Sequence, residues 1–194
     1  TISAHTLHAA PLLADWIATE IDRPLVIGPD EESEQWVSAI ASRIGAPYAV
    51  LRKIRHGDRS VDVEFPDLSR WKAHRPILVD DIASSGHTLI EAARKLPLSG
   101  FQRPVCAVVH GVFAEDSYER LKALSDRIVS SDSVPHESNA IWLAPLVAAA
   151  IVSAEAGQED IIRHRRPPEP LDEVERAGLD SFPASDAPPW TAGR

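Results

Sequence analysis

The segment 77–89 brings together residue types that could bind a sugar phosphate. An apolar run leads into Asp80 and Asp81, and paired carboxylates can accept hydrogen bonds from two neighbouring sugar hydroxyls. A turn rich in serine and glycine follows, then a helix, and the backbone N–H groups there can enclose a phosphate dianion. The candidate phosphate-binding residues of this turn are Ser84, Ser85, Gly86, His87 and Thr88. The simpler alternative is a solvated acid pair before a helix cap, but the turn that follows the acids favours a ligand site.

The elements that must position this segment alternate between strand and helix. Predicted strands span 24–28, 48–51, 76–79, 105–109 and 127–129, and predicted helices span 11–17, 33–44, 88–96, 115–124 and 144–154. Strands that are apolar throughout are typical of a parallel sheet covered by helices. The predicted fold class is therefore α/β, with a mostly parallel sheet and helices on both faces. Ligands of such sheets bind beyond the carboxyl ends of the strands, where Asp80 and Asp81 are expected.

Composition narrows the classes of function. The chain has 194 residues and a formal net charge of −9, and an acidic protein repels the phosphates of nucleic acid. Its single cysteine, Cys106, excludes a disulfide framework and a cysteine-based zinc site. The sequence shows neither an apolar run of membrane-spanning length nor a secretory leader pattern. We therefore expect a cytoplasmic protein that binds neither nucleic acid nor membrane.

The chain is expected to divide into a folded part and a tail. Residues 1–155 carry the alternating pattern of strands and helices. Residues 156–194 contain six of the sixteen prolines, which remove backbone donors and block regular pairing. This pattern predicts one α/β domain over 1–155 and a proline-rich, mobile C-terminal tail over 156–194.

The segment 77–89 resembles the phosphoribosyl-binding signature that type I phosphoribosyltransferases share with phosphoribosyl pyrophosphate (PRPP) synthetases, also called ribose-phosphate pyrophosphokinases. Two further segments resemble the synthetases. Lys53 and Arg55 match a Lys-X-Arg pair that ends a strand before a mobile loop, and Asp30 matches a Pro-Asp motif of the pyrophosphate and metal region. The likeness spans roughly residues 5–154 and corresponds to the C-terminal half of a synthetase.

This resemblance implies roles for the three matched residues. Lys53 and Arg55 would be catalytic cations that stabilise the charge on a transferring diphosphoryl group. Asp30 would bind Mg²⁺, the implied cofactor, which prefers oxygen ligands and shares them with substrate phosphates. The plainer alternatives are a solvated basic strand end and an acidic turn that stabilises a helix dipole. The sequence departs from the family pattern at Glu31 and at His87, where small residues are usual.

The resemblance also implies a type I phosphoribosyltransferase-like fold and an enzyme of nucleotide biosynthesis. The enzyme would transfer pyrophosphate from ATP to ribose 5-phosphate, giving PRPP and AMP, and would assemble with further copies of itself. A synthetase has two similar halves, and this chain resembles only the second. It is therefore either the C-terminal part of a longer enzyme, a half-length homologue that binds ribose phosphates without catalysis, or a chain that another subunit completes. A phosphoribosyltransferase that consumes PRPP is the remaining alternative.

Overall fold

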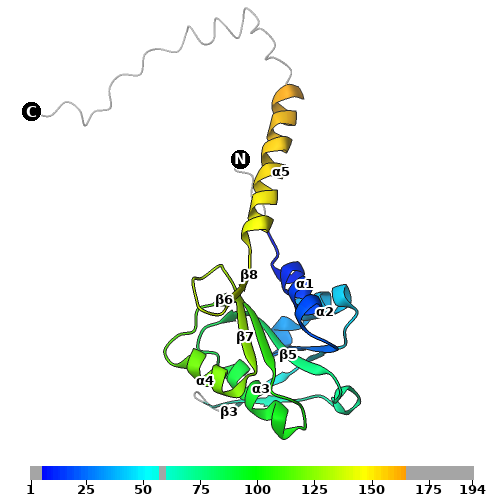
Figure 1. Cartoon of the computed structure of the whole chain (residues 1–194), viewed down its shortest axis with the longest axis vertical. Coiled ribbons are helices and arrows are strands. Elements are labelled where there is room, and N and C mark those ends of the chain that lie inside the picture. The colour runs from blue at the N-terminus through cyan, green and yellow to red at the C-terminus, as the bar shows by residue number, and fades with distance from the viewer. Residues whose placement is uncertain (1–5, 57–59, 165–194) are drawn as a thin grey trace, which may run out of the picture. The chain divides into compact units, whose positions relative to one another are not determined.

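A six-stranded parallel sheet forms the centre of the protein (Figure 1). The computed structural model describes the backbone of residues 6–56 and 60–164 and the side chains of residues 6–52 and 63–154. In sheet order the strands are β2 (Tyr48–Val50), β1 (Pro24–Gly28), β5 (Arg75–Ala83), β6 (Val105–Gly111), β7 (Arg127–Ser131) and β8 (Asn139–Ile141). Every neighbouring pair of strands runs parallel, which confirms the predicted α/β class.

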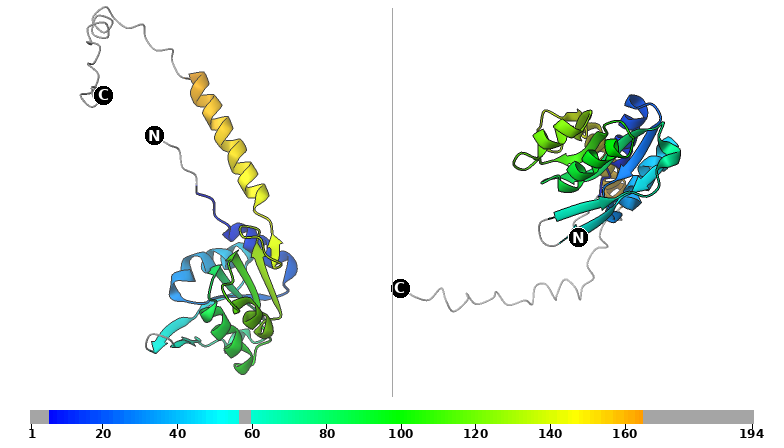
Figure 2. Two further views of the ribbon diagram at one scale, coloured as in Figure 1. Left: turned by 90° about the vertical axis from the view of Figure 1, so that its left-hand side faces the viewer. Right: turned by 90° about the horizontal axis from the view of Figure 1, so that it is seen from below.

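Helices cover both faces of this sheet (Figure 2). They are α1 (Ala10–Glu20), α2 (Glu34–Ile44), α3 (His87–Leu98) and α4 (Ser117–Leu124). Successive strand residues point to opposite faces, so each apolar strand feeds two cores. Val26, Ile77 and Val79 pack with α1 and α2. Leu25, Ile27 and Leu78 pack with α3 and α4, which explains why these strands are apolar at every position.

The helix boundaries follow from local chemistry. Pro11 lies in the first turn of α1, where the missing N–H leaves no hydrogen bond unmade. Gly45 ends α2 in the left-handed conformation, with φ 65°, and its N–H bonds back to the last turn. Asp30 caps the short 3-10 helix η1 (Glu31–Ser33), which leads directly into α2.

A separate antiparallel hairpin replaces the strand end and loop that the sequence suggests around Lys53 and Arg55. Its strands are β3 (Arg52–His56) and β4 (Ser60–Glu64), with the backbone of Lys53 opposite Val63. Polar and β-branched residues alternate along β4, as expected for a strand with one buried face. Part of the expected mobile loop over 56–61 is therefore strand. The loop centre, 57–59, lies outside the described residues.

The last helix, α5 (Ala144–His164), is longer than expected, because it continues ten residues past Ala154 and through Gly157. The structure divides the chain after Ile151, and the first unit contains the whole sheet. The expected boundary at 155 and the expected mobile tail stay predictions, since 165–194 lies outside the described residues. Within the described ranges, no helix combines the length and the apolar character needed to cross a membrane.

Candidate functional site

The chain reverses its direction of travel across the sheet between β1 and β5. From β1 it passes to β2 at one edge, whereas from β5 it passes to β6 on the other side. In open α/β sheets the crevice at such a reversal, beyond the carboxyl ends of the strands, is where ligands bind. Asp30 follows the end of β1, and the acid pair lies on β5, so the predicted site residues gather at this reversal.

Asp80 and Asp81 lie on the part of β5 that extends past its neighbour β1. Pairing with β1 ends at Leu78, whereas pairing with β6 continues to Ala83. The acids are therefore held by β6 on one side and open on the side of β1. Asp81 is exposed and its N–H donates to Asp80 Oδ1 over 3.0 Å, while Asp80 is half-buried.

The electrostatics show that Asp81 and Asp30 both act on Asp80. Burial, and then the negative charges of Asp81 and Asp30, raise the pKa of Asp80 from 3.8 to about 7. A carboxyl with this pKa exists in both protonation states near neutral pH, so it can accept a hydrogen bond or donate one. Perturbed acids in a crevice are a common sign of a functional site.

Asp30 stabilises the turn after β1, in addition to its electrostatic effect on Asp80. Its Oδ1 accepts the Ser33 N–H over 3.2 Å, and its backbone carbonyl accepts the Ser33 hydroxyl over 2.5 Å. Asp30 therefore caps the short helix η1. Gly28 is required at this turn, because a methyl group there would overlap the Ser33 hydroxyl.

The chemistry of these acids fits Mg²⁺. The described side chains include no group of three or more His, Cys, Asp or Glu arranged to hold a metal by themselves. Mg²⁺ does not need such a cage, because it commonly takes one or two carboxylates and fills its other positions with water and substrate phosphates. Asp30 and Asp80 could supply those carboxylates, and a cation there would relieve the repulsion that adds to burial in raising the pKa of Asp80.

The residues predicted to bind phosphate form a turn between β5 and α3, here called the serine turn (Ser84–Thr88). Gly86 caps α3 in the left-handed conformation, with φ 63°. Within the described chain, the backbone N–H groups of Ser85, Gly86, His87 and Thr88 donate to no protein acceptor. These donors and the helix dipole favour an anion at this position. The side chains of Ser84, Ser85 and His87 are exposed, and Thr88 is half-buried.

The support behind the serine turn comes from residues that the sequence alone does not group with it. Two backbone N–H groups of the connection between β6 and α4 donate to the turn, from Phe113 to the Ala83 carbonyl over 2.8 Å and from Ala114 to the Ser84 carbonyl over 3.1 Å. The Ser117 hydroxyl donates to the same Ser84 carbonyl over 3.0 Å.

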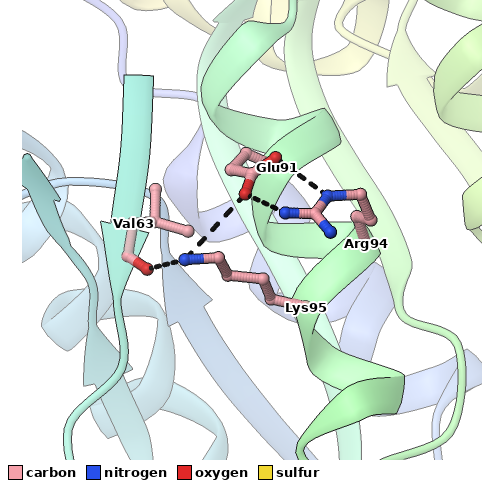
Figure 3. Close-up of polar contacts among 4 residues, drawn as sticks. All are labelled: Val63, Glu91, Arg94 and Lys95. Carbon is pink, nitrogen blue, oxygen red and sulfur yellow. Dashed lines mark hydrogen bonds and ion pairs between the residues drawn. The ribbon is translucent and has the colours of Figure 1, made fainter. Parts of the chain in front are cut away.

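The hairpin that carries Lys53 and Arg55 packs against α3, the helix that follows the serine turn (Figure 3). Lys95 Nζ on α3 donates to the Val63 carbonyl over 2.8 Å and lies 3.9 Å from Glu91. Val63 is buried in the same cluster as the α3 core residues. The backbone of Lys53 is thus fixed opposite an anchored residue, although the Lys53 and Arg55 side chains lie outside the described ones.

A cavity of about 370 Å³ lies between η1, the end of β2 and the base of the hairpin. Its lining includes the carboxylates of Glu31, Glu34 and Glu64. Arg52 also lines it and lies 3.4 Å from Glu31 and 4.0 Å from Glu64. The acidic lining is less suited to a polyphosphate than small residues would be, because like charges repel.

A second cavity, of about 590 Å³, lies at the opposite edge of the sheet, where the strands begin. Its cations are already engaged: Arg127 is 3.0 Å from Glu20, and Arg75 pairs with Asp126. It contains none of the predicted site residues.

The chain belongs to the phosphoribosyl transferase domain family, because residues 3–143 match that family model. Among curated relatives it is 30% identical over 153 residues to the ribose-phosphate pyrophosphokinase of Methanopyrus kandleri, covering 77% of this chain and 52% of the relative. It is 27% identical over 147 residues to the enzyme of that name from Sulfurisphaera tokodaii, covering 73% and 50%. The chain thus spans about half the length of these relatives. The matches confirm the resemblance to this enzyme family.

Solved structures support the fold. Phosphoribosylpyrophosphate synthetase from Mycobacterium smegmatis matches with a TM-score of 0.65 and 24% identity, over 77% of this chain and 51% of that one. Adenine phosphoribosyl transferase from Trypanosoma brucei, solved with AMP, pyrophosphate and ribose 5-phosphate, matches with a TM-score of 0.50 and 13% identity, over 88% and 76%. The type I phosphoribosyltransferase-like fold is therefore confirmed.

Proposed function

We propose that this chain is the ribose-phosphate-binding part of a PRPP synthetase, which transfers pyrophosphate from ATP to ribose 5-phosphate. The observation that carries the proposal is the acid pair and the serine turn at the reversal point of the sheet, with the hairpin of Lys53 and Arg55 packed on α3, the helix that follows the turn. The curated relatives named ribose-phosphate pyrophosphokinase support this choice within the family.

Each group of residues has a role that follows from its chemistry. The N–H groups and hydroxyls of the serine turn bind the 5-phosphate, and Asp80 and Asp81 accept the two ribose hydroxyls. The anomeric oxygen forms a bond to the β-phosphorus of ATP, the bond from that phosphorus to the AMP oxygen breaks, and AMP and a proton are released. Lys53 and Arg55 stabilise the charge on the transferring group. Asp30 and Asp80 would hold Mg²⁺, which would supply positive charge to neutralise the phosphates.

Two substitutions separate catalysis from sugar-phosphate binding. Lys53→Ala should lower turnover about 10²- to 10³-fold, as expected for one lost transition-state contact, with little change in ribose 5-phosphate affinity. Asp81→Asn should weaken that affinity instead. Arg52→Ala removes one charge from the same strand and is the matched control. AMP release and calorimetric titration provide the readouts, and unchanged binding and turnover in both variants would refute the site assignment.

A non-catalytic ribose-phosphate-binding regulator is the second candidate function. The acidic cavity beside Asp30 favours it, because Glu31 and Glu34 stand where a polyphosphate would need small or basic neighbours. Calorimetric titration with ribose 5-phosphate and then with ATP distinguishes the two. Binding of the sugar phosphate without ATP binding or AMP release would support the regulator. Pyrophosphate released from PRPP and a nucleobase would instead identify a phosphoribosyltransferase, which the family match also accommodates.

A further inference from the structure

We propose that Ser117 is a positioning residue that sets the direction of the phosphate-binding N–H groups in the serine turn. This inference rests on the proposed function, because it concerns the same ribose 5-phosphate site. Ser117 begins α4 and is far along the chain from the turn, but its hydroxyl donates to the Ser84 carbonyl over 3.0 Å. The residue is only 2% exposed, so water has little access to replace the lost bond if the hydroxyl is removed.

Three hydrogen bonds hold the backbone of the turn on the side that faces α4 and the connection leading to it. The Ala83 carbonyl accepts the Phe113 N–H, and the Ser84 carbonyl accepts both the Ala114 N–H and the Ser117 hydroxyl. Of these donors only the Ser117 hydroxyl belongs to a side chain. It is therefore the one bond that a substitution can remove without altering the backbone.

The direction of the Ser84 and Ser85 N–H groups follows from peptide geometry. In a planar trans peptide the carbonyl and the next N–H point in opposite directions. Because the Ala83 and Ser84 carbonyls face the connection between β6 and α4, the N–H groups of Ser84 and Ser85 point away from it. Ser117 thus acts on ligand binding through the Ser84–Ser85 peptide and need not touch the phosphate.

The connection that provides these donors is itself tightly fixed. Phe113 and Glu115 both have positive φ, 43° and 56°, which costs about 1–2 kcal/mol for a residue other than glycine. The Phe113 ring is held 5.1 Å from the Tyr118 ring and 4.7 Å from the His136 ring. A Cβ at Gly111 would come within 2.7 Å of the Phe113 ring, so the chain before it is also confined. A strained conformation persists only where its surroundings determine it, which makes this connection a rigid support.

The test compares Ser117→Ala with Ser125→Ala. Ser125 is a matched control because it is also a buried serine, at the other end of α4, where its hydroxyl contacts Cys106 Sγ over 3.2 Å. We expect Ser117→Ala to weaken ribose 5-phosphate binding about tenfold, equivalent to about 1.4 kcal/mol, and Ser125→Ala to leave it within twofold. Backbone order parameters from nuclear magnetic resonance of the ligand-free protein should fall at Ser84 and Ser85 in the first variant only.

The two readouts separate this inference from the proposed function. If the unmodified protein binds no ribose 5-phosphate, the proposed function fails, whereas the order parameters still decide whether Ser117 fixes the turn. Unchanged order parameters in Ser117→Ala would overturn the inference. So would an affinity that stays within twofold of the unmodified protein, or an equal loss in Ser125→Ala.

Discussion

Asp80→Asn should make the protein more stable at neutral and alkaline pH while weakening its ligand site. The pKa of Asp80 rises from 3.8 to about 7 on folding, because burial and the charges of Asp81 and Asp30 oppose ionisation. Between these values the folded state keeps a proton that the unfolded state has released. Stability therefore falls as pH rises through this window and levels off above it. Asparagine keeps the oxygen that accepts the Asp81 N–H but carries no charge to oppose.

The size of the effect follows from the pKa change. Three pH decades at about 1.4 kcal/mol each give about 4 kcal/mol as an upper limit for the cost of ionising Asp80 in the folded state. Water reaches a half-buried carboxyl, and mobile ions screen the neighbouring charges, so we expect about 2 kcal/mol at high pH. At low pH the protonated carboxyl and the amide are nearly equivalent, and the difference should approach zero.

Urea unfolding of both proteins from about pH 4.5 to about pH 8.5 measures this difference directly. Asp22→Asn is the control, because it removes one charge from a side chain that is 92% exposed. Asp80→Asn should gain more stability at high pH than this control does. A gain from Asp80→Asn that is the same at both ends of the range would refute the reasoning, since it would not come from ionisation.

Three further predictions test the parts that support the site. Lys95→Met removes the donor to the Val63 carbonyl, so steady-state kinetics should show turnover falling about tenfold with ribose 5-phosphate affinity kept; equal losses in both would contradict the anchoring role. Gly28→Ala forces a methyl group against Ser33 and should cost about 1–3 kcal/mol in urea unfolding, and an unchanged midpoint would show that the turn can adjust. Glu115→Gly relieves a positive φ and should raise stability by about 0.5–1 kcal/mol in thermal unfolding, whereas a loss would mean that the side chain matters more than the backbone.

The sheet could be predicted because its signal is local. The strands at 24–28 and 105–109 are short apolar runs bounded by turn residues, and the helices between them repeat their apolar residues with the helical period. β8 was missed because Asn139–Ile141 has too few residues to show a pattern. The hairpin was missed because the sequence 52–56 is almost wholly polar and its two strands pair with each other rather than with the sheet.

The candidate site also has one part that the sequence predicts and one part that only the structure shows. Asp80, Asp81 and the serine turn are contiguous, so the sequence alone groups them, and resemblance to a known family added Asp30 and Lys53. Ser117 could not be found, because its contact with Ser84 depends on how β6 and β5 lie in register. The sequence places a serine at the start of a helix, where capping that helix is the ordinary expectation.

The extension of β5 past β1 explains both why the acid cluster lowers folding stability and why it favours ligand binding. Because β6 pairs with β5 as far as Ala83, the backbone that carries Asp80 and Asp81 is held in place. Asp30 adds to the repulsion between their carboxyls from the end of β1, across the open side. A cation or a hydrogen-bonding diol that binds there weakens the repulsion among these acids, which the ligand-free folded protein already carries. The free energy that this repulsion takes from folding is therefore partly recovered on binding. The same geometry that lowers stability above neutral pH therefore favours ligand binding, and Asp80→Asn should reverse both effects together.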